Sequence, residues 1–85
     1  MTLEEIHAEI IQALTKVAPE VRPASIQPGV GFRDQFDLDS VDFLSFVVAL
    51  HERLGVEVPE ADYANLTTLE RAGQYLQSRL TARQK

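Results

Sequence analysis

Ser40 is the residue whose surroundings most clearly indicate a chemical role. Its hydroxyl lies among acidic residues and just ahead of a strongly apolar segment. The residue before it, Asp39, is a favourable helix N-cap, since an aspartate carboxylate accepts hydrogen bonds from the N–H groups of the first turn. Ser40 would then begin the helix, with its hydroxyl exposed at the positive end of the helix dipole, where a phosphate group is tolerated. The same spacing is also typical of a helix cap without chemistry, so both interpretations stay open at this point.

The acidic residues around Ser40 could instead bind a metal ion, and their spacing tests that possibility. They are Asp34, Asp37, Asp39 and Asp42. A calcium-binding EF-hand loop needs oxygen ligands at its first, third and fifth positions, glycine at the sixth and glutamate at the twelfth. In a loop counted from Asp37, valines stand at two of the ligand positions and an aspartate replaces the glycine. We therefore expect no metal site, and we interpret the isolated histidines His7 and His51 as surface residues.

The composition excludes several classes of protein. The chain has 85 residues, with 13 acidic and 8 basic residues and a formal net charge of −5. We expect one domain covering residues 1–85, which is too short for a barrel enzyme or a dinucleotide-binding domain, and hence no independent enzyme. An acidic chain does not favour nucleic acid, and the absence of cysteine excludes disulfides and thiolate metal sites. No secretory signal or membrane span is evident, so we expect a cytoplasmic protein that binds no membrane.

Two capping boxes mark the starts of helices. Thr2 with Glu5, and Thr67 with Glu70, each place a hydroxyl three residues before a carboxylate. Each side chain of such a pair can accept a hydrogen bond from the backbone N–H of the other residue. Apolar residues then recur at steps of three and four, which predicts amphipathic helices. Gly55 is expected to end the helix that begins near Ser40.

These patterns predict an all-α fold. Prolines and glycines interrupt any helix between residues 19 and 39, where several apolar residues indicate a long loop lying against the core. We expect a small antiparallel helical bundle of three main helices plus one short helix, with the long loop between the first and second main helices. The expected helices cover about residues 3–17, 40–54, 60–65 and 68–80.

The sequence on both sides of Ser40 resembles that of an acyl carrier protein. The stretch Leu38–Val41 resembles the attachment motif of that family, which usually reads Asp-Ser-Leu, and the resemblance runs without a gap from Phe32 to Leu76. The motif alone is weak, but it is followed in order by blocks that resemble the family's recognition helix, its loop ending in proline, its short helix and its entry to the last helix. These blocks are Val41–Leu50, Gly55–Pro59, Glu60–Tyr63 and Leu66–Leu69.

The resemblance implies a role for Ser40. In this family a phosphopantetheinyl transferase moves 4′-phosphopantetheine from coenzyme A onto the serine hydroxyl. Acyl groups are then carried as thioesters on the thiol of that arm, and the carrier itself catalyses nothing. Asp39 would hold the helix cap beside the attached group, while activation of the hydroxyl would belong to the transferase. The implied pathway is fatty-acid biosynthesis, polyketide synthesis or another specialised branch of acyl and lipid metabolism.

The resemblance and the helical spacing together predict a partner surface on the helix at about 40–54. The expected contacts are Val41, Asp42, Ser45, Val48 and Glu52, of which the four at steps of three and four share one helical face. The valines could equally be core residues and the acids an ordinary solvated face. Carriers for fatty acids have more acids along this helix, so we expect a specialised carrier that works as a monomer with the transferase and with acyl-transferring or acyl-modifying enzymes bearing basic surfaces.

The same helix has a second face that we expect to lie inside the bundle. In the family, comparable positions can line a cavity for the acyl chain, although ordinary core packing is the simpler interpretation. The residues concerned are Phe43, Phe46, Val47 and Leu50. Two alternatives to an acyl carrier remain open: a carrier for aminoacyl or D-alanyl groups, and an acidic helical module that binds proteins and is never modified.

Overall fold

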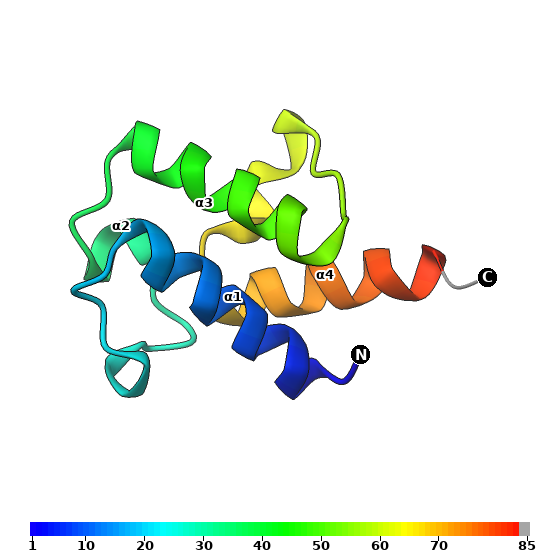
Figure 1. Cartoon of the computed structure of the whole chain (residues 1–85), viewed down its shortest axis with the longest axis horizontal. Coiled ribbons are helices and arrows are strands. Elements are labelled where there is room, and N and C mark those ends of the chain that lie inside the picture. The colour runs from blue at the N-terminus through cyan, green and yellow to red at the C-terminus, as the bar shows by residue number, and fades with distance from the viewer. Residues whose placement is uncertain (84–85) are drawn as a thin grey trace.

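The computed structural model describes residues 1–83 and is helical throughout its regular structure, with no strand in that range. The all-α prediction is confirmed. Three long helices form the bundle, and α1 runs in the opposite direction to α3 and α4 (Figure 1). The long helices are α1 (Leu3–Val17), α3 (Ser40–Leu54) and α4 (Leu69–Arg83). The shorter elements are η1 (Pro23–Ser25), α2 (Phe32–Gln35) and η2 (Glu60–Leu66).

The core lies between the three long helices, with α1 packed against both α3 and α4. Each helix contributes its apolar stripe, because burying that stripe is the main source of stability for an amphipathic helix. The largest side chains with almost no exposed surface are Ile6, Ile10 and Leu14 of α1, Phe46 and Leu50 of α3, Leu76 of α4, and Phe32 and Leu66 between them. No helix in the described range is long and apolar enough to cross a membrane.

The segment between α1 and α3 is more ordered than a long loop would be. It contains η1 and α2, and the buried Phe32 donates its backbone N–H to the carbonyl of Thr67 over 2.7 Å. The side-chain amide of Gln35 makes three hydrogen bonds across the segment, accepting from Gln27 N and donating to the carbonyls of Gln27 and Val30. These contacts hold the chain against the core immediately before the acidic stretch that leads into α3.

The predicted capping box at Thr67 is wrong, because a different residue caps the start of α4. Thr67 still has helical dihedral angles at the end of η2, and its hydroxyl donates to the carbonyl of Ala64. The next residue, Thr68, is the cap, because its hydroxyl accepts a hydrogen bond from Arg71 N at 3.0 Å. The continued turn of η2 therefore shifts the cap by one residue.

His7 also differs from the prediction, because it is not a plain surface residue. It is half-buried on α1, and its Nε2 atom is buried without a hydrogen-bond partner in the described range. A Cβ atom at Gly73 of α4 would lie 2.6 Å from the His7 ring at Cδ2, which is closer than carbon atoms pack. Gly73 therefore permits the close approach of α4 to α1 at this point. His51 is exposed, as expected, and its Nδ1 lies 3.1 Å from the Val56 carbonyl.

Tyr75 joins α4 to η2, and its titration should make that junction sensitive to high pH. Its hydroxyl donates to Asp62 Oδ2 over 2.7 Å. Burial raises the pKa of Tyr75 and the Asp62 hydrogen bond raises it further, against a smaller lowering by Arg79. A phenol whose pKa is raised by folding contributes its full stability below its unfolded pKa of about 10, and that contribution is lost as pH rises through the folded pKa.

We expect Tyr75→Phe to unfold at a lower temperature than the wild type at neutral pH. Loss of the hydrogen bond should lower the free energy of unfolding by roughly 1 kcal/mol. The difference should shrink as the pH rises from about 10, where the phenol of the unfolded chain ionises, through the raised pKa of the folded chain. Thermal unfolding of both chains from pH 7 to 11 measures this trend. A difference that stays constant across the range would show that the hydrogen bond does not set the pH dependence.

Candidate functional site

Ser40 is the first residue of α3, and its side chain is exposed. Asp39 is the N-cap, as the sequence predicted, with an extended backbone and an Oδ1 atom that accepts from Asp42 N at 2.8 Å. Asp42 reciprocates, since its Oδ2 accepts from Asp39 N at 3.3 Å. The two carboxylates thus form a capping box around Ser40. The sequence analysis missed this second role of Asp42, although an acid three residues after the cap is the expected signal.

Leu38 anchors the chain on the other side of the site. Its side chain is buried, and its backbone N–H donates to the Phe36 carbonyl over 2.9 Å. Its own carbonyl accepts from Arg33 Nε at 3.3 Å, which brings a guanidinium close to the acidic stretch. The buried Leu38 and the capped Asp39 therefore fix the backbone on which Ser40 stands, while the serine side chain itself projects into solvent.

The local chemistry of Ser40 suits a covalently attached phosphate group. Its side chain is exposed, and its hydroxyl takes part in none of the hydrogen bonds found in residues 1–83, so the hydroxyl is accessible from solvent. A phosphodiester there would lie at the N-terminus of a long helix, where backbone N–H groups and the dipole favour negative charge. A serine nucleophile needs a base within hydrogen-bond reach, and the described part of this chain places none on Ser40.

An open groove of about 550 Å³ runs along α3 beside the C-terminal end of α1. Three large apolar side chains of α3 are exposed on this side of the molecule: Val41 (69%), Leu44 (48%) and Val48 (54%). Their exposure excludes core packing for the two valines. The groove is lined by Lys16, Val17, Val41, Asp42, Leu44, Ser45, Val48, Ala49 and Glu52.

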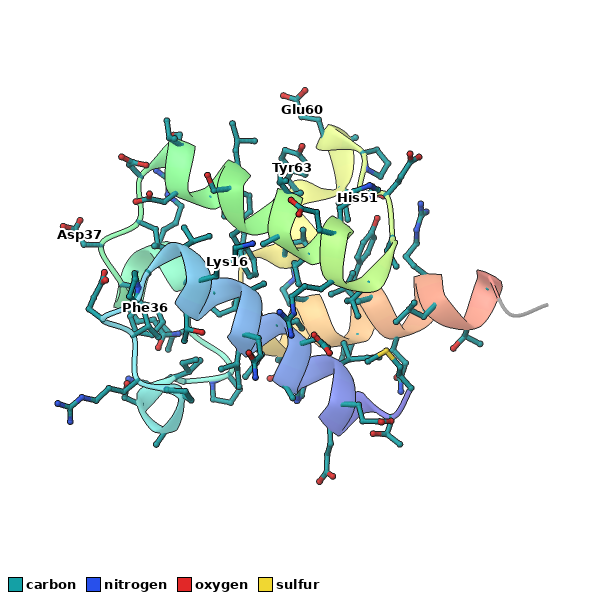
Figure 2. The ribbon with its side chains drawn as sticks, in the orientation of Figure 1. Lys16, Phe36, Asp37, His51, Glu60 and Tyr63 are labelled. Carbon is teal, nitrogen blue, oxygen red and sulfur yellow. The ribbon has the colours of Figure 1, made fainter. Side chains whose placement is uncertain are left out.

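The groove contains the five residues of α3 that the sequence predicted as a partner surface, together with others that it missed. Leu44 shares the exposed side of α3 with Val41 and Val48, so its helical position was a usable signal. Lys16 and Val17 come from α1, and no spacing within α3 could have placed them there. Figure 2 shows Lys16 on the side of α1 that faces α3.

The side chains predicted for an acyl-chain cavity lie in or against the core. Phe46, Val47 and Leu50 are almost fully buried, while Phe43 is half-buried. The Phe43 ring centroid lies 6.1 Å from that of Phe46 and 6.1 Å from that of Tyr63. The Phe46 ring in turn meets Phe32 edge-on at 5.4 Å. Ordinary aromatic packing thus accounts for these positions, and their contact with an acyl chain stays a prediction.

The acidic residues do not form a metal centre in the described part of the chain. No group of three or more His, Cys, Asp or Glu side chains is close enough there to hold an ion. Asp39 and Asp42 are engaged in the helix cap, which gives both carboxylates a structural role. The acidic residues near Ser40 thus cap α3 or lie exposed on the surface around it.

Comparisons with known proteins agree with this geometry. The family model for the phosphopantetheine attachment site matches residues 8–76. An acyl carrier protein of Rubrobacter xylanophilus is 29% identical over 77 residues, covering 87% of this chain and 95% of the relative. One from Acidothermus cellulolyticus is 32% identical over 76 residues, covering 89% of each chain. The meromycolate extension acyl carrier protein of Mycobacterium tuberculosis is 32% identical over 77 residues, covering 91% of this chain and 66% of the relative.

The matched region begins inside α1 and ends inside α4, so it contains all of α3 with its capped start and parts of the two other long helices. The group that this family carries is 4′-phosphopantetheine, and the exposed serine hydroxyl at a helix N-terminus fits the attachment of such a group. The resemblance inferred from the sequence is therefore confirmed. This chain belongs to the acyl carrier protein family and has the family's phosphopantetheine attachment domain.

Proposed function

We propose that Ser40 carries the 4′-phosphopantetheine arm and that the chain transports acyl groups as thioesters on it. The observation that carries this proposal is the position of Ser40, an exposed hydroxyl at the capped N-terminus of α3 within the matched family region. Asp39 holds the helix start beside the attached group through its hydrogen bond to Asp42 N. The arm supplies the thiol, which a chain without cysteine cannot provide itself.

We propose further that partner enzymes dock on the α3 groove. The transferase that modifies Ser40 and the enzymes that load, modify or remove acyl groups would contact Val41, Asp42, Ser45, Val48 and Glu52, all of which line it. The exposed valines offer apolar contact area, while the two acids favour basic groups on the partner. The chain catalyses nothing in this scheme and acts as a cytoplasmic monomer between encounters.

The proposal also includes a position for the acyl cargo on α3. An acyl group of a fatty-acid, polyketide or other specialised pathway would pack against the side of α3 that includes Phe43, Phe46, Val47 and Leu50. Phe43 is the most exposed of these side chains and lies at the edge of the core, so it would meet the chain first. The large phenyl rings at positions 43 and 46 favour a short or kinked acyl chain, because the close-packed core must open to admit one.

Intact mass spectrometry tests the carrier function. The chain is incubated with coenzyme A and a phosphopantetheinyl transferase of broad specificity, and its mass is measured before and after. We expect the mass to rise by one phosphopantetheine group per chain. An unchanged mass, obtained with a transferase that loads a reference carrier in the same buffer, would contradict the proposal and favour an unmodified protein-interaction module.

A further inference from the structure

Lys16 is the only basic residue that lines the α3 groove within the described range, and it comes from the last turn of α1. Its side chain is exposed and takes part in no ion pair in the described range, where the one salt bridge joins Arg53 to Glu9. Figure 2 shows it in the space between the ribbons of α1 and α3. The Lys16 ammonium is therefore available to a molecule that covers the groove.

The lining of the groove combines exposed apolar side chains with charges of both signs. Val41, Leu44 and Val48 expose about half or more of their surface, at 69%, 48% and 54%. Two acids of α3, Asp42 and Glu52, line the groove together with Lys16 of α1. A row of exposed aliphatic side chains between two helices is the kind of surface that receives the apolar face of a partner helix.

The opposite charges restrict which helix can bind there. A uniformly basic partner would pair with the acids of α3 but would place like charge against Lys16, which is unfavourable. Covering Lys16 would also remove water from its ammonium, and a buried charge is costly unless it is paired. A partner that places an acid opposite Lys16 avoids both costs, so Lys16 discriminates between partners even if its ion pair adds little affinity.

We propose that the groove binds an amphipathic helix of a partner protein with mixed charge, and that Lys16 determines this preference. The partner helix presents apolar side chains to Val41, Leu44 and Val48, basic groups to Asp42 and Glu52, and an acidic group to Lys16. This inference rests on the proposed carrier function, because it concerns the enzymes that dock beside Ser40. It differs from the expectation of uniformly basic partner surfaces.

Two synthetic amphipathic helical peptides with the same leucine face provide the test. The mixed peptide has arginines on the edge that meets α3 and a glutamate on the edge that meets Lys16, whereas the basic peptide has arginine at that last position. Each is titrated into the isotope-labelled full chain, and backbone amide shifts give the site and the dissociation constant. We expect the mixed peptide to bind the wild type about fivefold more tightly, equal to roughly 1 kcal/mol.

Variants separate Lys16 from other causes. Lys16→Glu should reverse the preference and Lys16→Met should remove it. Arg71→Glu, a matched charge reversal at an exposed position of α4 outside the groove, should keep it. Equal affinities for the wild type, a preference unchanged in Lys16→Glu, no binding, or shifts away from the groove would each overturn the inference. Concentration-dependent shifts in the groove without peptide would also overturn it, because a second copy would then cover this surface.

The same samples also separate this inference from the proposed function. Each variant is loaded with coenzyme A and the transferase, and its intact mass is measured. A chain that is loaded but shows no charge preference contradicts only the role of Lys16. A wild-type chain that is not loaded contradicts the carrier function, whatever the peptides do.

Discussion

Replacing Ser40 by alanine is expected to abolish addition of the phosphopantetheine group, with no residual loading by intact mass. The substitution removes the only atom to which the phosphate can be attached at this position. Alanine is a good helix former, and the capping hydrogen bonds join Asp39 to Asp42 without involving the Ser40 side chain. The fold should therefore be retained, and the free energy of unfolding, measured by thermal unfolding, should stay within about 0.5 kcal/mol of the wild-type value.

Ser78→Ala is the matched control for this experiment. Ser78 is also an exposed helical serine, but it belongs to α4 and lies outside the groove. We expect this variant to be loaded to completion, because it retains the hydroxyl at position 40. Loading of Ser40→Ala, or complete loss of loading in Ser78→Ala with the fold intact, would contradict the assignment of Ser40.

Among the substitutions predicted in this chain, Phe46→Ala should lower the free energy of unfolding the most. Phe46 has no exposed surface, and its ring contacts both Phe32 and Phe43 at the centre of the bundle. Truncating a buried phenylalanine costs about 3–5 kcal/mol, because it removes apolar contacts and leaves a cavity. A domain of this size is stable by roughly 4–13 kcal/mol, so the variant should be largely or partly unfolded near physiological temperature.

Leu44→Ala separates this effect from a general sensitivity of α3. Leu44 lies on the same helix but is 48% exposed, so its truncation creates no cavity and should cost less than about 1 kcal/mol. Urea unfolding followed by circular dichroism measures both variants. Similar midpoints for the two variants would contradict the placement of Phe46 at the centre of the core.

The local features of the sequence predicted most of the helical architecture. Capping side chains and apolar periodicity act over three or four residues, so they are visible in the sequence around Thr2, Asp39 and Gly55. The structure contains the Thr2 and Asp39 caps, and Gly55 ends α3 with a φ of 67°. That left-handed conformation favours glycine because a side chain would clash with the backbone. The exposed position of Ser40 followed from the same local pattern.

Features that depend on contacts between distant segments could not be read in this way. Lys16 joins the groove because α1 packs beside α3, and the periodicity of either helix alone does not show which lysine lies there. His7 is half-buried because Gly73 of α4 approaches it. The shifted cap at Thr68 depends on how far η2 continues, which tertiary packing decides. The sequence predicted the helix that forms the site, whereas the residues that α1 adds to it could be identified only from the packed bundle.

The central claim is that Ser40 itself carries the prosthetic group. Proteolysis of the loaded wild-type chain, followed by fragmentation of its peptides in a mass spectrometer, identifies the modified residue directly. We expect the added phosphopantetheine mass on the fragment ions that contain Ser40, and on no peptide that contains only Ser25, Ser45 or Ser78. Localisation of the group to any residue other than Ser40 would contradict the account.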